Sequence, residues 1–271
     1  MVEKTPLEAK VVTANGAQIY CQVSGKGPAV LFIPGLGGDG GPFDVVANRL
    51  SDRYTTITYD RRGHSRSTPP FEWHKTSMTQ QADDAAALLE QLGIETATVY
   101  GNGIGGLIAL EMLIHHPDVI TKAILHDPTI YNVLEDGPHQ DVPKGAGDLL
   151  RSTFFTRGPQ TTINLFLRWE YGPEALAATP GFILGRITNN GETFVMIDFP
   201  AFAFYKPDLK ELEAVKTPAV VLASSATPSW RRVMCNWVGE HIHARVESFL
   251  GPHAPYFDHP LEMVAALQEY L

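Results

Sequence analysis

Six residues near the middle of the chain, from Gly101 to Gly106, have the pattern of a turn that presents a catalytic nucleophile. They read Gly-Asn-Gly-Ile-Gly-Gly, follow a short apolar run and precede a helical pattern. In a nucleophile elbow, G-x-S-x-G, glycines flank a residue held at a strained positive φ, which points its side chain into the active site. The central position here is Gly103. The sequence therefore predicts the setting of a nucleophile without the hydroxyl group that would attack a substrate.

The elements around this turn alternate between strands and helices. Short apolar runs predict strands over residues 29–33, 55–59, 96–100, 119–125, 219–223 and 246–250. Periodic patterns predict helices over residues 43–50, 77–92, 107–116, 229–240 and from Pro260 onward. Asn15-Gly16 further predicts a hairpin near the amino terminus. This alternation is typical of an α/β protein with a mostly parallel sheet that is covered on both faces.

The pattern changes between residues 129 and 209, where Gly, Pro and aromatic residues are frequent and the periodicity is mainly helical. We predict an inserted helical cap over 129–209. The core would then be formed by residues 1–128 and 210–271.

Composition excludes several classes of function. A net charge of −9, without a Lys/Arg cluster, argues against nucleic acid as a partner. The first residues lack the apolar core of a signal peptide, and no stretch is apolar enough to span a membrane. The two cysteines, Cys21 and Cys235, are far apart and have no metal-type spacing. We expect a cytoplasmic protein with neither metal nor cofactor and without membrane contact, and the sequence leaves a homo-oligomer open.

Several signals in sequence order resemble the α/β-hydrolase superfamily. They are the Gly-rich loop 35–41, the segment 60–67, the elbow, the cap and the late Gly251-Pro252-His253. The resemblance implies the α/β-hydrolase fold and acyl transfer by a serine nucleophile, a histidine base and an orienting carboxylate.

The resemblance also implies positions for the catalytic groups. The segment 223–228, which follows the strand after the cap, contains no carboxylate. Asp127, at the end of the strand before the cap, is therefore our candidate for the acid. His253 is the candidate base, preferred to His259, which directly precedes Pro260. The backbone N–H groups of Ile104 and of Leu36 or Gly35 would form the oxyanion hole.

A finer resemblance is to the zearalenone lactonases. It depends on the acid at Asp127 and on three segments, 226–228, 198–200 and 250–256. Related esterases share this placement of the acid. The resemblance implies a small-molecule apolar ester or lactone as substrate, of the class of zearalenone-type macrolactones.

Gly103 has three competing explanations. The chain could be an engineered serine-to-glycine variant that holds substrate without turnover. It could belong with the cofactor-free dioxygenases of the superfamily, in which a His–Asp pair deprotonates a substrate that reacts with oxygen. It could also be a ligand sensor without catalysis. Two further histidines were assigned structural roles: His126 as a buried neighbour of Asp127, and His64 as part of a solvated loop.

Overall fold

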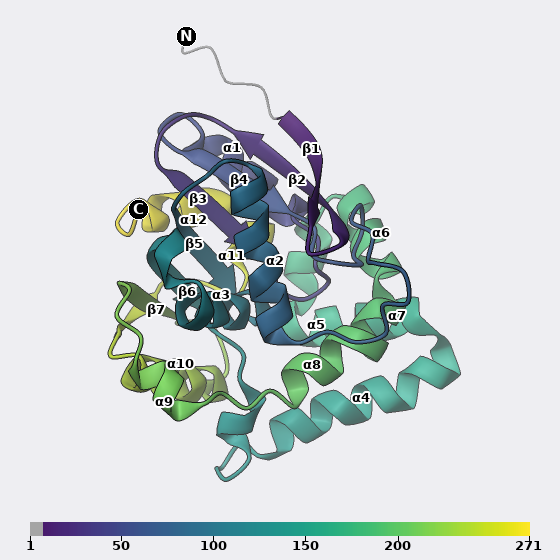
Figure 1. Ribbon diagram of the computed structural model, residues 1–271. Coiled ribbons are helices and arrows are strands. Elements are labelled where there is room, and N and C mark those ends of the chain that lie inside the picture. Colours follow the sequence, from purple (N-terminus) through teal and green to yellow (C-terminus); the bar gives the residue numbers. More distant parts are fainter. Residues whose placement is uncertain (1–7) are drawn as a thin grey trace.

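The computed structural model describes residues 8–271, and in this part of the chain a single mixed sheet of eight strands forms the centre (Figure 1). The strands are β1 (Glu8–Ala14), β2 (Ala17–Ser24), β3 (Ala29–Ile33), β4 (Thr55–Tyr59), β5 (Ala97–Asn102), β6 (Ile120–His126), β7 (Ala219–Ser224) and β8 (Arg245–Phe249). Their order across the sheet is β1-β2-β4-β3-β5-β6-β7-β8. Only β1 and β2 run antiparallel to their neighbours, and the other strands pair in parallel. The predicted fold class is confirmed.

Helices follow most of the strands. Those of the core are α1 (Asp44–Leu50), α2 (Met78–Gln91), α3 (Ile104–His115), α10 (Ser229–His241), α11 (Pro255–Asp258) and α12 (Pro260–Leu267). Those between β6 and β7 are α4 (Asp141–Arg157), α5 (Pro159–Ala178), α6 (Gly181–Asn189), α7 (Gly191–Thr193), α8 (Phe199–Ala203) and α9 (Leu209–Glu213). Short 3₁₀ turns η1 (Gly41–Phe43), η2 (Pro117–Val119) and η3 (Tyr131–Leu134) and the π-helical turn η4 (Phe194–Asp198) complete the set.

Two apolar layers cover the sheet because successive side chains of a strand point to opposite faces. Leu31 and Val99 pack in the core cluster that also contains the apolar faces of α2, α3 and α10. Phe32 and Tyr100, one residue further along the same strands, pack in the cluster of α1 and α12. The central strands are thus buried on both faces, as the continuous apolar runs predict.

The segment between β6 and β7 is mainly helical, and Figure 1 places α4, α5, α7 and α8 together below the sheet, with α9 apart from them beside α10. Helix α5 is interrupted at Gly172, whose φ of 85° lies outside the helical region. The π-helical turn η4 is a second irregularity, and such turns are frequent at functional sites. We call this helical segment, α4 to α8, the insertion. The cap boundaries at 129 and 209 stay a prediction.

Polar contacts attach the insertion to the Gly-rich loop that follows β3. Arg186 of α6 forms a two-point ion pair with Asp39, at 2.7 and 2.8 Å. Asn190 donates to the carbonyl oxygen of Gly37 at 2.7 Å. Asp198 of η4 forms a fully buried ion pair with Arg61, which also donates to the Gly35 carbonyl oxygen at 3.0 Å. The insertion and the loop are therefore held as one unit.

Candidate active site

The turn between β5 and α3 has the backbone conformation of a nucleophile elbow. Gly103 has φ 58° and ψ −117°, a region that residues with a side chain rarely adopt. A Cβ on Gly101 would overlap the carbonyl oxygen of Gly105, and one on Gly105 would overlap that of Ile33. The two flanking glycines are therefore required by packing, as the motif predicts.

A side chain at position 103 would point at His253. The Cβ position of residue 103 lies 3.2 Å from His253 Nε2 and 3.7 Å from the hydroxyl of Thr129. Gly103 itself is anchored, because its N–H donates to the His126 carbonyl oxygen at 3.0 Å and its carbonyl oxygen accepts from the Thr129 N–H at 3.1 Å. Both the N–H and the carbonyl group of Gly103 are thus held by hydrogen bonds.

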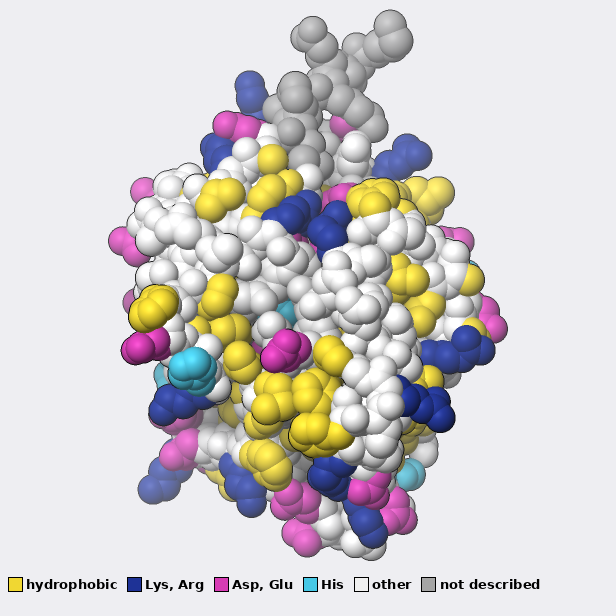
Figure 2. Space-filling view, turned by 90° about the vertical axis from the view of Figure 1, so that its right-hand side faces the viewer, with side chains coloured by type: hydrophobic (Ala, Val, Ile, Leu, Met, Phe, Trp, Pro, Cys, Tyr) yellow, Lys and Arg dark blue, Asp and Glu magenta, His cyan; other side chains and the backbone are white. Residues whose placement is uncertain are grey.

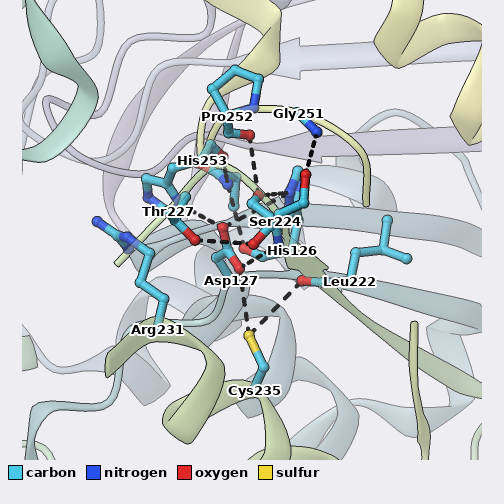
Figure 3. A network of polar contacts seen from close by, with 12 residues as sticks. His126, Asp127, Leu222, Ser224, Thr227, Arg231, Cys235, Gly251, Pro252 and His253 are labelled. Atoms are coloured by element: carbon cyan, nitrogen blue, oxygen red, sulfur yellow. Dashed lines mark hydrogen bonds and ion pairs between the residues drawn. The ribbon is translucent and has the colours of Figure 1, made fainter. Parts of the chain in front are cut away.

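Asp127 lies at the carboxyl end of β6 and faces His253 (Figure 3). Its Oδ2 is 3.0 Å from His253 Nδ1, and its Oδ1 accepts from the Ser224 N–H at 3.0 Å. The Sγ of Cys235 contacts the same Oδ1 at 3.5 Å. Asp127 has a φ of 43°, which is unusual for a residue other than glycine.

The environment of Asp127 keeps its carboxylate ionised. Burial acts to raise the pKa of Asp127, but the hydrogen bond with His253 and the charge of Arg231 hold it well below the usual value. Because an ionised carboxylate only accepts hydrogen bonds, His253 Nδ1 must be the donor. In the neutral ring, the other nitrogen, Nε2, is the acceptor that a general base requires.

His253 is held on the loop after β8 by contacts on its backbone and on its ring. Its carbonyl oxygen accepts from the Asn102 side chain at 2.6 Å, which ties the histidine loop to the elbow. The ring of Tyr171 stacks on the imidazole with centroids 5.7 Å apart. The residue is 4% exposed, so its orientation is set by the protein and not by solvent.

Of the three residues proposed for the oxyanion hole, Ile104 directly follows Gly103, and Gly35, which precedes Leu36, packs against the same turn. Gly35 cannot carry a side chain, since a Cβ would lie 2.6 Å from the Asn102 carbonyl oxygen. Leu36 and Ile104 are buried. Ile104 begins α3, so its N–H precedes the hydrogen-bond ladder of that helix. The oxyanion hole at these positions stays a prediction.

Tyr171 of the insertion reaches this turn. Its hydroxyl lies 3.6 Å from the Cβ position of Gly35. Burial raises the pKa of Tyr171 and the charge of Glu170 raises it further, while a hydrogen bond from the Leu36 amide lowers it in part. The phenol therefore stays neutral and lies against one of the amides proposed for the oxyanion hole.

Two charged residues of this site were not identified from the sequence. Glu170, at the end of the first part of α5, lies 3.5 Å from His253 Nε2 through its Oε1. The same oxygen is 2.7 Å from Arg231 Nη2, and the two side chains are 7% and 2% exposed. Burial acts to raise the pKa of Glu170, but Arg231 and His253 lower it to about 2. A single acidic residue in the apolar stretch around Trp169 was the only signal in the sequence.

The other two histidines of interest differ in outcome. His126 is buried, as predicted, and bonds to the Tyr100 hydroxyl at 2.7 Å and to the Ser224 hydroxyl at 2.8 Å. Burial lowers its pKa to about 4, so its ring is neutral at neutral pH. The prediction for His64 was wrong: its side chain is fully buried, with Nε2 3.1 Å from Asp198. The insertion covers the loop that carries His64.

Residues 8–271 contain no cluster of three or more His, Cys, Asp or Glu side chains that could hold a metal ion. In the same part of the chain, no helix combines the length and apolar character needed to cross a membrane. A surface hollow of about 700 Å³ lies beside α2, lined by residues such as Asp83, Glu90 and His116. It lies away from Gly103, Asp127 and His253, which do not line it.

The comparisons with known proteins agree with this fold. A family model described as alpha/beta hydrolase fold matches residues 28–182, more than half of the chain. This chain belongs to the α/β hydrolase fold family. A hydrolase of Bacillus subtilis (strain 168), YraK, described as uncharacterized, is 29% identical over 261 residues, covering 94% of this chain and 93% of the relative.

Solved structures share the fold at lower identity. The enol-lactonase from Burkholderia xenovorans LB400 has a TM-score of 0.76 at 19% identity, with 96% of this chain and 99% of that chain covered. Est816, described as an N-acyl homoserine lactone degrading enzyme, has a TM-score of 0.73 at 19% identity, with 97% and 100% covered. These likenesses extend over the sheet and the insertion.

Proposed function

We propose that this protein is a serine-type carboxylic ester or lactone hydrolase in which Gly103 stands at the position of the nucleophile. One observation carries the proposal: a side chain at residue 103 would point at His253 Nε2 from 3.2 Å, and the opposite ring nitrogen is 3.0 Å from Asp127. This is the arrangement that acyl transfer requires, with the hydroxyl missing.

With serine at position 103, each group has a defined role. The serine Oγ would attack the carbonyl carbon while His253 Nε2 takes its proton, and Asp127 would stabilise the resulting imidazolium. The N–H groups of Ile104 and Leu36 or Gly35 would bind the oxyanion, with the Tyr171 hydroxyl moving off the Leu36 amide. His253 would return the proton to the leaving alkoxide. Water would then hydrolyse the acyl-enzyme by the same route.

With glycine at position 103, the chain would bind the substrate and turn it over slowly. Triad enzymes without their nucleophile retain roughly 10³–10⁴-fold acceleration over water from binding and the oxyanion hole. Glycine also relieves the strain of the positive φ. We interpret the chain as a substrate-trapping serine-to-glycine variant.

The substrate class that we propose is a small, apolar ester or lactone, of the zearalenone macrolactone type. The resemblance of the acid position and of segment 198–200 to zearalenone lactonases supports it. Two structural relatives are described as lactone-degrading enzymes. Figure 2 shows hydrophobic side chains gathered in the lower half of one face, where Figure 1 places helices of the insertion. Among the insertion's exposed apolar residues are Phe155, Phe182 and Met196.

The test compares Gly103→Ser with the unchanged chain and with Gly103→Ala. The alanine variant is the matched control, because it adds the same Cβ beside His253 without a hydroxyl. Each protein is assayed against aryl esters and macrolactones, with mass spectrometry for an acyl adduct. We expect serine alone to raise turnover by several orders of magnitude and to carry the adduct. If Gly103→Ser gains no activity on any ester or lactone, the proposal is wrong.

The intact His253–Asp127 pair beside a glycine also favours a second candidate, a cofactor-free dioxygenase. In that reaction His253 would deprotonate the substrate, and no nucleophile at position 103 is needed. Such an enzyme would consume oxygen with Gly103 unchanged and lose this activity in His253→Ala. Measurement of oxygen uptake separates it from a hydrolase.

A further inference from the structure

Four buried polar atoms of side chains that lie beside Gly103 or follow from His253 through Glu170 to Arg231 lack a hydrogen-bond partner in the described part of the chain. They are His253 Nε2, Glu170 Oε2, Thr129 Oγ1 and Arg231 Nη1. The side chains of Glu170 and Arg231 are 7% and 2% exposed, and His253 and Thr129 are 4% and 1% exposed. Most buried polar groups are satisfied by protein or by an ordered water. The clustering of these four unpartnered atoms indicates a binding position for a small polar group.

The distances define that place. The Cβ position of residue 103 is 3.2 Å from His253 Nε2 and 3.7 Å from Thr129 Oγ1. Glu170 Oε1 is 3.5 Å from the same Nε2, which is too long for a strong hydrogen bond. A water oxygen can lie about 2.8 Å from both atoms when it sits beside the line that joins them.

The charges define what the water would do. In the neutral imidazole, with His253 Nδ1 donating to Asp127, Nε2 is an acceptor, and Glu170, which is paired with Arg231, also only accepts. A water between them therefore donates both of its hydrogens, and its lone pairs are left for an electrophile. The two acceptors come from separate elements, the loop after β8 and helix α5.

We propose that Glu170 and His253 hold a hydrolytic water at the position of the missing serine side chain, and that this water is the nucleophile of the chain as it stands. The inference rests on the proposed function, since the substrate is the same ester or lactone. The water oxygen bonds to the carbonyl carbon while one proton passes to His253 Nε2. The bond to the leaving oxygen then breaks with its electron pair, and His253 returns the proton to that alkoxide. The products are a carboxylic acid and an alcohol.

Glu170 is a catalytic residue in this reaction because it contacts the attacking water. In a serine-containing variant, the serine side chain takes this position, and a water held by the same two acceptors beside it would attack the acyl-enzyme in the second half of the reaction. Glu170 would then act on deacylation and not on acylation, in which the serine hydroxyl is the nucleophile. This asymmetry distinguishes a water-orienting role from a purely structural one.

The first experiment measures hydrolysis of a p-nitrophenyl ester by the unchanged chain, by Glu170→Gln and by His253→Ala. The control is Glu174→Gln, the same substitution one turn along the chain at an exposed position. General acid–base groups typically contribute on the order of 10²-fold or more. We expect a loss of this order in Glu170→Gln, no loss in Glu174→Gln, and no acyl adduct by mass spectrometry. A rate for the unchanged chain no higher than that of His253→Ala overturns the proposal.

The second experiment places Glu170→Gln in the Gly103→Ser protein. Pre-steady-state release of p-nitrophenol reports acylation as a burst, and the subsequent steady rate reports deacylation. We expect the steady rate to fall at least about 10-fold more than the burst rate. Equal slowing of both phases would assign Glu170 a structural role and overturn the proposal.

Glu170→Gln leaves the buried charge of Arg231 without its partner, so the variant could fail to fold. The double variant Glu170→Gln/Arg231→Gln removes both charges and gives the same kinetic test. The two proposals fail separately. If Gly103→Ser has no esterase activity, the proposed function is wrong. If that variant is active but Glu170→Gln changes neither the slow hydrolysis nor the deacylation, only the role of Glu170 is wrong.

Discussion

The Asp127 carboxylate lies 3.0 Å from His253 Nδ1, although 126 positions separate the two residues in the chain. Parallel pairing of β6 with β7 and of β7 with β8 brings their carboxyl ends to the same edge of the sheet. A residue at the end of β6 thereby faces a loop that follows β8. The acid before the insertion can therefore serve a histidine at the end of the chain.

This contact predicts the effect of Asp127→Asn in the Gly103→Ser protein. Asparagine preserves the shape but can donate a hydrogen bond to Nδ1, which favours the wrong tautomer of His253. We expect kcat to fall on the order of 10⁴-fold, with little change in KM. Steady-state kinetics on the best ester substrate would measure this, with Asp118→Asn, an exposed aspartate, as control. Activity within about 10-fold of the parent would contradict the role of Asp127.

The elbow glycines predict a difference between two Gly→Ala substitutions. In Gly105→Ala the new Cβ would overlap the backbone carbonyl of Ile33, which cannot move without disturbing β3. We expect a loss of about 3 kcal/mol in the free energy of unfolding. Gly145→Ala lies in α4 with no atom near the new Cβ, and should stabilise the protein by up to about 1 kcal/mol. Urea denaturation of both variants measures this, and similar values for the two would show that the packing argument is wrong.

The sequence predicts the fold and the elbow well because their signals are local. The apolar run of β5 and the glycines at 101, 103 and 105 lie within ten residues of one another. Close packing requires glycine at 101 and 105, and the positive φ favours it at 103. Asp127 and His253 were found because each follows a strand end in the pattern of the family. The structure brings Asp127 and His253 together beside Gly103. Their chemical roles belong to the proposed function.

Other parts of the site could not be predicted because they depend on tertiary contacts of the insertion. Glu170 belongs to the site only because the first part of α5 ends beside His253 and because Arg231 of α10 pairs with it. Neither position has a local pattern that marks it. The sequence predicts a solvated loop for His64, but Asp198, 134 positions away in the chain, lies 3.1 Å from its Nε2 in the fully buried pair. Contacts made by side chains of an insertion are the hardest to predict from the sequence.

The buried ion pair between Arg61 and Asp198 predicts that Asp198→Asn is strongly destabilising. Both side chains are fully buried, and Arg61 also donates to the Gly35 carbonyl oxygen. Removing one partner leaves an uncompensated charge, which typically costs about 3–5 kcal/mol. The exposed pair of Asp148 and Arg151 is the control, and Asp148→Asn should change stability by less than about 1 kcal/mol.

Thermal unfolding of the two aspartate variants tests this expectation. Asp198 lies on η4, so loss of its ion pair with Arg61 should also loosen the insertion over the site. We therefore expect Asp198→Asn to raise KM in the Gly103→Ser protein. If Asp198→Asn and Asp148→Asn had equal melting temperatures, the buried pair would not attach the insertion.

Asp44 predicts a pH dependence of stability that is opposite to that of a paired carboxylate. Burial raises its pKa from 3.8 to about 6, partly offset by the charge of Arg66, and Asp39 raises it further. Its Oδ1 has no hydrogen-bond partner among the described residues. The folded state therefore binds the proton more tightly than the unfolded state does. Its ionisation costs stability progressively between pH 4 and 6, and the full cost is present above pH 6.

Asp44→Asn removes this cost. We expect the variant to be more stable than the parent at pH 8, by at most about 3 kcal/mol for a shift of about two pKa units. The favourable interaction of Asp44 with the amino terminus of α1 would reduce this gain by a few tenths of a kcal/mol. At pH 4, where the parent's Asp44 is protonated, the difference should largely disappear. Chemical denaturation at pH 4, 6 and 8 measures the difference at each point, and a variant no more stable than the parent at pH 8 would show that Asp44 is ionised in the folded protein without penalty.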